Sequence, residues 1–349
     1  MTSFALFRQP HATAVTLVEQ TVGEPLEFTD ASLLDGLQGF VVAPFAVTPA
    51  EPIVVIRPDH LQTFSTPDDL ILTSPSPAAC HPSASTRSTY AADFATFHSV
   101  LISGRFSKLV LARCACEERT DDTSPLELFV RACHRYPRLF IALVSTARTG
   151  TWLTATPELL LEATPDGCRT IALAGTMQLT ADQLAGEGEQ LTWSVKNIQE
   201  QRYVASFIAD RLKGLSLDYC EEGPHTVRAA DLVHLRSDFT FTLRDGVSLS
   251  DILTALHPTP AVCGLPQADA LSFILSREHA PRRYYSGFMG PLQLGTSPSA
   301  LYVSLRCMQI FPDRYLLYAG GGILRESTEE REWQETEAKL ATMRSLLTS

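Results

Sequence analysis

Tyr318 to Lys339 reads YAGGGILRESTEEREWQETEAK, and it joins three consecutive glycines to a run with charged residues at helical spacing. The glycines that begin at Gly320 allow the backbone to approach an anion closely. Glu332, Glu335 and Lys339 lie three and four residues apart, so they share a helix face with apolar residues that should be buried. The stretch predicts an anion cradle beside a metal site. The alternative is an exposed Glu335–Lys339 pair that follows a glycine turn.

The composition favours a folded protein that handles small molecules. The chain has 349 residues, 45% of them hydrophobic, which is enough for a large core in one or two domains. Its net charge of −11 argues against a nucleic-acid binder, whose surface must neutralise phosphates. We find no membrane span, no signal-like leader and no metal-type spacing among the eight cysteines, so we expect a cytoplasmic protein.

The order of the predicted elements indicates an α+β fold. Residues 1–90 are expected to complete the fold of a catalytic domain that covers residues 91–349. Helices are predicted at 94–101, 125–136, 194–212, 248–256, 267–278 and 328–347, and strands at 109–115, 139–146, 169–174, 284–294, 300–310 and 315–319, with short strands near Trp152, Leu160, Leu217, Val227 and Phe239. Because these elements do not alternate as regular βαβ units, a layered arrangement is favoured over a Rossmann or TIM fold.

Glu200 falls on the inner side of the predicted helix 194–212. It precedes Val204 by four residues and Phe207 by seven, and both belong to the apolar face of that helix. The carboxylate is therefore expected to point inward, where it needs a partner.

Eight segments resemble, in order and spacing, the chorismate-binding enzymes, a family that includes isochorismate, anthranilate, aminodeoxychorismate and salicylate synthases. The segments are SKLVLAR (107–113), TPELLL (156–161), TIALAGT (170–176), KNIQEQRYV (196–204), HPTPAVCG (257–264), RRYYSGFMG (282–290), LYVSLR (301–306) and YAGGGI with EWQETEAKL. The resemblance covers residues 95–349. It implies the anthranilate synthase component I-like fold, in which two packed β-sheets surround the site and helices flank them.

The resemblance implies chorismate as the substrate and Mg²⁺ as the cofactor. By motif match, Glu200 and Glu335 are the direct metal ligands, with Glu332 nearby. A hard cation such as Mg²⁺ is commonly held by a few carboxylates, with water completing its coordination.

Two residues match the catalytic positions of the family. Glu158, which the sequence places at a helix start, matches the general acid that protonates the departing hydroxyl, and this role needs a pKa raised by burial. Lys108 matches the general base that activates water, which requires desolvation or neighbouring cations. Without the resemblance, the ordinary interpretations are a first-turn glutamate that favours the helix dipole and a strand-end lysine that reaches solvent.

The resemblance also implies a set of substrate-binding residues. Arg and Lys suit carboxylates, Arg through a planar fork and Lys as a point charge. The set is Gly175, Thr176, Arg306, Gly320 and Lys339 for the carboxylates, with His257 and Tyr285 expected to line the pocket. His257 fits equally well as a satisfied core histidine.

Lys108 and Ala174 distinguish among the activities of the family. Members that use ammonia typically lack a lysine at the first position, and those that form a covalent adduct carry a lysine where this chain has Ala174. The pair therefore fits water addition at C2 by an isochorismate synthase, and the glutamines that flank Glu200 resemble menaquinone-type members. Salicylate synthase, a siderophore-pathway isochorismate synthase, a subunit that needs a glutaminase partner and a silent binding protein are the alternatives. Lys108 argues against the glutaminase partner.

Overall fold

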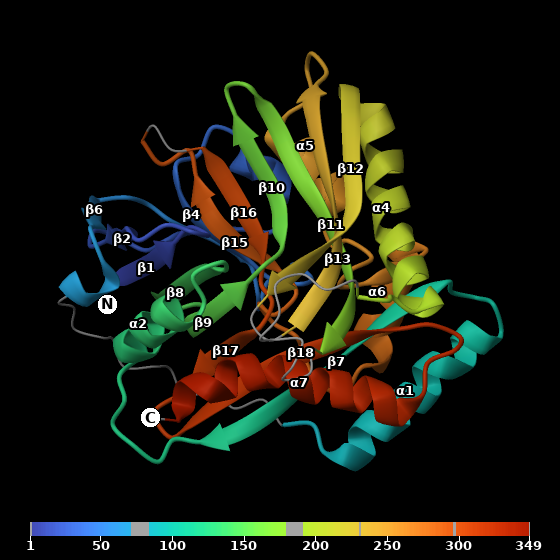
Figure 1. Cartoon of the computed structure of the whole chain (residues 1–349). Coiled ribbons are helices and arrows are strands. Elements are labelled where there is room, and N and C mark those ends of the chain that lie inside the picture. The colour runs from blue at the N-terminus through green and yellow to red at the C-terminus, as the bar shows by residue number, and fades with distance from the viewer. Residues whose placement is uncertain (1, 71–83, 179–190, 230–231, 296–297, 349) are drawn as a thin grey trace.

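The computed structural model in Figure 1 describes residues 2–70, 84–178, 191–229, 232–295 and 298–348. In these residues two nine-stranded sheets form the body of the protein, and their neighbouring strands pair antiparallel. Sheet A has the order β14 (Gly264–Leu265), β7 (Lys108–Glu118), β18 (Arg314–Ile323), β17 (Cys307–Ile310), β9 (Gly150–Thr156), β8 (Phe140–Thr146), β1 (Ser3–Arg8), β2 (Val15–Gln20) and β6 (His60–Phe64). Sheet B has the order β12 (Ser216–Ala229), β13 (Leu232–Leu243), β11 (Gly167–Gln178), β10 (Leu159–Thr164), β16 (Ser299–Val303), β15 (Phe288–Leu292), β4 (Gly39–Ala43), β5 (Ile53–Ile56) and β3 (Leu26–Phe28).

The first core lies between the two sheets. Phe7 and Phe140 enter it from sheet A, and Phe40 and Tyr302 enter it from sheet B. The rings of Phe140 and Tyr302 stack with their centroids 4.1 Å apart, so the sheets are in direct contact. The predicted α+β class with two packed sheets is confirmed.

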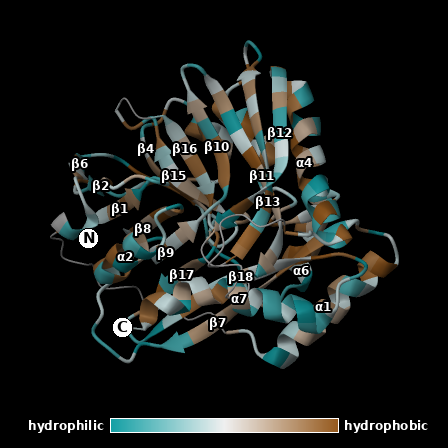
Figure 2. Ribbon diagram, viewed as in Figure 1, coloured by the Kyte–Doolittle hydropathy of each residue, from teal (hydrophilic) through white to brown (hydrophobic). Residues whose placement is uncertain are grey.

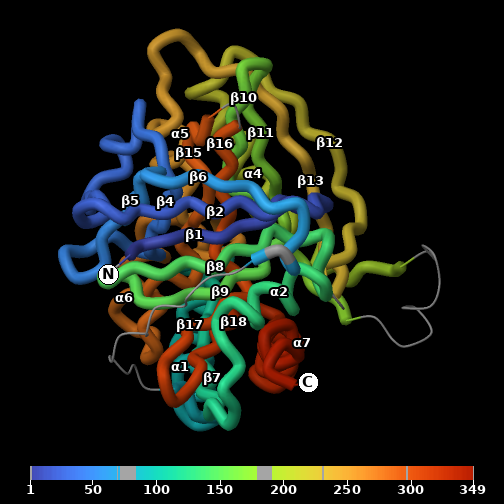
Figure 3. The backbone as a smooth tube through the Cα atoms, turned by 90° about the vertical axis from the view of Figure 1, so that its left-hand side faces the viewer, coloured from blue at the N-terminus to red at the C-terminus, as the bar shows by residue number. Residues whose placement is uncertain are grey.

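Helices cover the outer faces of both sheets (Figures 1 and 3). α4 (Val195–Leu215) and α5 (Leu249–Leu256) share a core with sheet B, and α2 (Pro125–Arg135) and α7 (Glu329–Leu347) share one with sheet A. α1 (Arg87–Ile102) and α6 (Gln267–Arg277) pack beside β7. Figure 2 shows brown and teal residues alternating along α4, as expected for a helix with one buried face. Among the described helices, none has both the length and the apolar character that crossing a membrane requires.

Local signals explain where the helices begin. The hydroxyl of Ser124 caps α2 by accepting a hydrogen bond from the backbone N–H of Glu127, and Pro125 occupies the first turn. Ser194 caps α4 in the same way through the N–H of Asn197. α7 lacks a side-chain cap, but its first turn carries three glutamates, which the helix dipole favours.

The N-terminal segment belongs to both sheets. β1, β2 and β6 extend sheet A, while β3, β4 and β5 extend sheet B. These strands contribute Phe7 and Phe40 to the core between the sheets. The domain boundary at residue 90 stays a prediction.

Several predicted strands differ from the observed ones. The strand expected at 300–310 is two strands in different sheets, β16 and β17, because the chain turns at Arg306, whose φ is +44°. The strand expected at 284–294 is shorter, since Arg283 and Ser286 also have positive φ and form a turn before β15. The two strands expected near Leu217 and Val227 are the single long strand β12.

Candidate active site

Two crossings between the sheets place Glu158 and Arg306 side by side. Glu158 lies where the chain passes from β9 in sheet A to β10 in sheet B, and Arg306 lies where it returns from β16 to β17. The N–H of Val303 donates to the carbonyl of Glu158 at 2.9 Å, and the N–H of Ala155 donates to the carbonyl of Arg306 at 3.1 Å. The helix start predicted at Glu158 is therefore wrong, because the chain continues directly into β10.

A pocket of about 620 Å³ opens at these crossings. The predicted residues that line it are Glu158, Gly175, Thr176, Glu200, Tyr285, Arg306, Gly320 and Lys339. The structure thus gathers residues from both sheets and from two helices around one cavity.

Glu158 is a buried carboxyl group that faces cationic side chains. Burial raises the pKa of Glu158 to about 8, although Lys108, Lys339 and Arg306 pull it in the opposite direction. Glu158 therefore carries a proton at neutral pH, as a general acid requires.

Lys108 and Glu200 form a buried ion pair beside the pocket. The Nζ atom of Lys108, at the start of β7, lies 3.0 Å from Oε1 of Glu200, and the lysine side chain has no exposed surface. Burial alone would raise the pKa of Glu200, but Lys108, Lys196 and Lys339 outweigh burial and hold that pKa below its usual value. The predicted inward orientation of Glu200 is confirmed, because the side chain is 9% exposed.

The three glycines are strand residues, whereas the alternative sequence interpretation makes them a turn. They lie within β18 and pair with β7. A Cβ on Gly322 would lie 1.9 Å from Oε1 of Glu200, and one on Gly321 would lie 3.3 Å from Oε2 of Glu332. On Gly320 the same atom would lie 2.8 Å from the hydroxyl of Tyr285. The missing side chains are what allows the acidic groups to pack against this strand.

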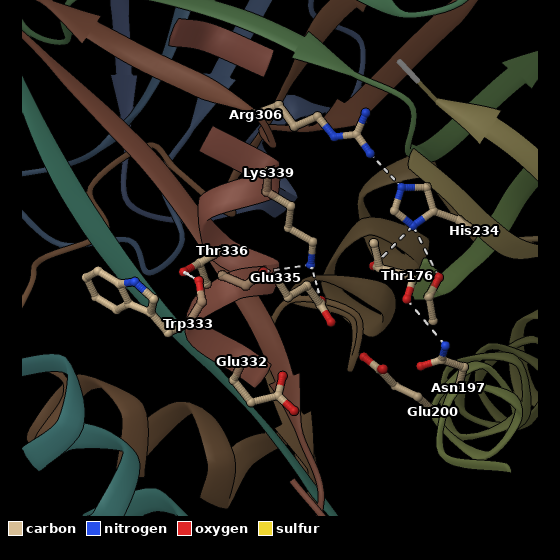
Figure 4. Close-up of polar contacts among 12 residues, drawn as sticks. Thr176, Asn197, Glu200, His234, Arg306, Glu332, Trp333, Glu335, Thr336 and Lys339 are labelled. Carbon is tan, nitrogen blue, oxygen red and sulfur yellow. Dashed lines mark hydrogen bonds and ion pairs between the residues drawn. The ribbon is translucent and has the colours of Figure 1, made fainter. Parts of the chain in front are cut away.

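α7 presents Lys339 to the pocket. Its Nζ donates to the carbonyl of Gly320 and to Oε1 of Glu335, both at 2.8 Å. Figure 4 shows this lysine between Glu335 and the Arg306 side of the site. The Glu335–Lys339 pair is 20% and 18% exposed, so it is not the solvated surface pair that the sequence alternative describes.

Glu332 is paired with Lys196, a residue to which the sequence analysis gives no role. The two side chains form an ion pair between α7 and α4, and Glu332 is only 1% exposed. Burial and then Glu335 raise the pKa of Glu332, and Lys196 opposes both effects. Its second oxygen, Oε2, is buried and has no hydrogen-bond partner in the described part of the chain.

The donor chemistry of these glutamates fits a hard divalent cation, but the structure does not gather them into one ligand group. Among the described residues, no three His, Cys, Asp or Glu side chains form a group that could hold a metal ion. Glu200, Glu332 and Glu335 each turn to a different lysine instead. Mg²⁺ needs only one or two protein carboxylates beside water and substrate oxygens. The unpaired Oε2 of Glu332 supports an oxygen-seeking ion at this place.

His234 on β13 connects the guanidinium of Arg306 to the strand that carries Gly175. Nε2 of His234 lies 2.5 Å from Nη2 of Arg306, and Nδ1 lies 3.2 Å from the carbonyl of Gly175 (Figure 4). Since guanidinium can only donate, the ring proton belongs on Nδ1. Burial, Arg306 and Lys339 lower the pKa of His234 well below its usual value, so the ring is neutral.

The backbone at Gly175 has a conformation that suits glycine. Gly175 has a φ of +71° and lies in an irregularity of the pairing between β11 and β13. A Cβ there would lie 2.9 Å from the carbonyl oxygen of Asn197. The amide of Asn197 donates to the carbonyl of Thr176 at 3.3 Å, which ties α4 to this turn.

His257 is not brought into the pocket. It ends α5, where it packs edge-on against Phe288 with ring centroids 5.0 Å apart. Burial lowers the pKa of His257 to about 4. The prediction that it lines the pocket is wrong, because His257 follows the end of α5, which packs on the outer side of sheet B, and is absent from the pocket lining.

Lys108 and Glu335 are absent from the pocket lining, and they adjoin it through Glu200 and Lys339. Glu332 and its partner Lys196 are both absent from the lining. The sequence analysis missed His234 and Lys196. A histidine inside the apolar run LVHL is a signal for the first, and a lysine four residues before Glu200, in a chain with few lysines, is a signal for the second.

Comparisons with known proteins identify the family and the fold. The family described as "Chorismate binding enzyme" matches residues 57–348. The "Salicylate biosynthesis isochorismate synthase" of Pseudomonas aeruginosa is 33% identical over 251 residues, which are 70% of this chain and 52% of that protein. "Isochorismate synthase MenF" of Escherichia coli is 36% identical over 198 residues, 56% of this chain and 45% of that protein.

The chain spans about half the length of these two curated relatives. Among solved structures, the putative 2,3-dihydroxybenzoate-specific isochorismate synthase DhbC of Bacillus anthracis superimposes with a TM-score of 0.81. That alignment covers 99% of this chain and 96% of the other at 22% identity, so it shows the fold alone. With a family match that extends over most of its length, the chain belongs to the chorismate-binding enzymes.

Proposed function

We propose that the chain is an isochorismate synthase, which isomerises chorismate to isochorismate with the help of Mg²⁺. Water adds at C2 of the ring and the C4 hydroxyl leaves as water, so that the net composition of the substrate is unchanged. The observation that carries the proposal is the buried carboxyl of Glu158 in a pocket that Arg306 and Lys339 also line.

Glu158 supplies the proton for the departing hydroxyl. An ionised carboxylate cannot do this, and burial keeps Glu158 protonated up to a pKa of about 8. Lys108 accepts the proton of the attacking water. Because Lys108 is paired with Glu200 at 3.0 Å, this role requires that Glu200 turn to another positive charge.

Arg306 and Lys339 supply the positive charge that binds the substrate carboxylates. Both line the pocket. Arg306 is oriented by its contact with His234, and Lys339 by its hydrogen bond to the carbonyl of Gly320. Within the proposal, Glu200 and Glu335 hold Mg²⁺, with Glu332 beside them. The ion, when bound, polarises the ring carboxylate of the substrate.

Ala174 and Lys108 support water, rather than ammonia or a lysine, as the nucleophile. Ala174 lines the pocket next to Gly175, so no amine is available at that position. We further propose that the chain needs no glutaminase subunit. The menaquinone branch is part of the proposal, because the E. coli relative named MenF has the higher identity of the two reported.

We also propose that the protein works in the cytoplasm. The described cysteines are free thiols, including five buried ones, which suits a reducing compartment.

The test is to incubate the purified chain with chorismate and Mg²⁺, with and without ammonium, and to identify the products by chromatography and mass. The proposal expects a product of unchanged mass that forms without ammonium and is lost when EDTA removes the metal. If salicylate and pyruvate form instead, the chain is a salicylate synthase and the proposal is wrong. A product that forms only with ammonium, or only after a partner is added, would refute it.

A further inference from the structure

Each glutamate of the proposed metal site is neutralised by its own lysine. The pairs are Glu200 with Lys108, Glu335 with Lys339 and Glu332 with Lys196. They use three of the four lysines in the sequence. The fourth, Lys213, forms an exposed pair with Asp210 on the surface of α4. So few lysines, placed so selectively, suggest that these ammonium groups have a shared task at the site.

Lys196 differs from the other two lysines in where it stands. It lies on α4 one turn before Glu200, yet its Nζ contacts Glu332 on α7. The Lys196 side chain is 24% exposed, whereas that of Glu332 is 1% exposed, so the lysine separates the buried carboxylate from solvent. Burial alone would lower the pKa of Lys196, but Glu332, Glu200 and Glu335 together raise it. Of the three glutamates, the one that Lys196 pairs with in the described residues is Glu332.

We propose that Lys196 is the internal counter-cation of this site, whose charge competes with a divalent cation for Glu332 beside the proposed ligands Glu200 and Glu335. Lys196 is then a positioning residue that holds Glu332 in place before the cation arrives and makes cation binding weaker than the glutamates alone would allow. The inference rests on the proposed function only in taking the bound cation to be divalent.

The geometry around Glu332 supports an exchange of cations. Its Oε1 contacts Lys196, while its Oε2 has no hydrogen-bond partner in the described residues and is buried. A Cβ on Gly321 would lie 3.3 Å from this Oε2 and 3.7 Å from Oε1 of Glu335, so the two carboxylates share one side of the glycine strand. Removing one member of a buried ion pair leaves the other as an uncompensated charge. Without Lys196, an incoming cation would be the charge that relieves Glu332.

The test measures Mn²⁺ binding by electron paramagnetic resonance at pH 8, in the absence of chorismate, for the full chain and its variants. Mn²⁺ serves as the probe because it shares the preference of Mg²⁺ for carboxylate and water ligands. We expect Lys196→Met to bind Mn²⁺ about tenfold more tightly than the unmodified chain, because the competing charge is gone. Lys196→Arg keeps the charge and should bind as the unmodified chain does.

Two further variants complete the experiment. Lys213→Met is the matched control, because Lys213 lies on the same helix but forms an exposed pair with Asp210, and it should leave Mn²⁺ affinity unchanged. Lys196→Met combined with Glu332→Gln removes both charges of the pair, so it avoids a buried unpaired charge and should lose the gain in affinity. Equal or weaker Mn²⁺ binding by Lys196→Met, or the absence of Mn²⁺ binding in all variants, would overturn the proposal.

The outcome separates this inference from the proposed function. Tighter Mn²⁺ binding by Lys196→Met in a chain that does not convert chorismate would support the counter-cation and refute the isochorismate synthase. Isochorismate formation by the unmodified chain, together with unchanged Mn²⁺ affinity in Lys196→Met, would support the isochorismate synthase and refute the counter-cation.

Discussion

Glu200 packs against Gly322 so closely that a Cβ on the glycine would lie 1.9 Å from the Oε1 atom of the glutamate. Glu200 is fixed in turn by Lys108, so it cannot move aside without breaking a buried ion pair. Glu200 can therefore occupy its position only because residue 322 has no side chain.

Gly322→Ala is expected to reduce isochorismate formation by at least about 100-fold, because the methyl group displaces Glu200 from Lys108. The rate is measured by chromatography of the product. Gly214→Ala on α4 is the control, since a Cβ there meets nothing within 4 Å. That change should keep the activity and raise stability by about 0.5–1 kcal/mol. An active Gly322→Ala variant would show that Glu200 has no fixed role.

Lys108→Ala should lower kcat by about 10²–10⁴-fold, the range for loss of a general base. Binding of chorismate in the presence of Mg²⁺, followed by calorimetry, should be largely retained, because Arg306 and Lys339 remain. Lys213→Ala provides the control for loss of a lysine. Retained water addition in the Lys108 variant would refute its role as the base.

Glu158→Gln should lower kcat by a similar factor, since the amide keeps the shape but is not an acid. In the unmodified enzyme, kcat/KM should fall as the pH rises through about 8, where Glu158 loses its proton. A pH–rate profile checks this. A profile that is flat from pH 6 to 9.5 would assign the acid to another group.

Glu158 should also make folding stability depend on pH. Burial raises its pKa from the ordinary 4.5 to about 8 in the folded protein, so between these values the folded state holds a proton that the unfolded chain has lost. The contribution of Glu158 to the free energy of unfolding is greatest below pH 4.5. It falls as the pH rises toward 8, by up to about 1.4 kcal/mol per pH unit. The free energy of unfolding, measured with urea at pH 5, 6.5 and 8, should therefore fall with rising pH in the unmodified chain and fall less in Glu158→Gln. A constant difference would mean that Glu158 titrates alike in both states.

His234→Phe should raise KM for chorismate about tenfold and change kcat less, because Nη2 of Arg306 loses its acceptor at Nε2. His234→Gln, which can offer an acceptor oxygen, should recover part of the affinity. Steady-state kinetics of both variants separate the effects. If KM is unchanged and only kcat falls, His234 acts on the reaction itself rather than through Arg306.

The sequence predicts helices and their buried faces well, because capping residues and periodic apolar positions are local. Ser124 and Ser194 begin α2 and α4 near the expected residues, and Glu200 points inward as its spacing with Val204 indicates. The resemblance to the family adds most of the pocket residues, which no local pattern could assemble.

The remaining features depend on contacts between distant strands. The segment LYVSLRCMQI (301–310) contains no local signal for the change of sheet at Arg306, because the residues before and after Arg306 are both mostly apolar. The same holds for Glu158, since a Thr-Pro-Glu sequence begins helices as readily as it links strands. Lys196 and His234 gain their importance from partners 136 and 72 residues away, respectively.

The two sheet crossings at Glu158 and Arg306 mean that the site is divided along the chain. Fragments separated between β10 and β16 would place Lys108 and Glu158 on one piece and Arg306 and Lys339 on the other. Neither piece would hold a complete wall of the pocket, so catalysis recovered on mixing them would show that both sheets had re-formed around a shared core. Turnover would then serve as a complementation signal for assembly of the whole body.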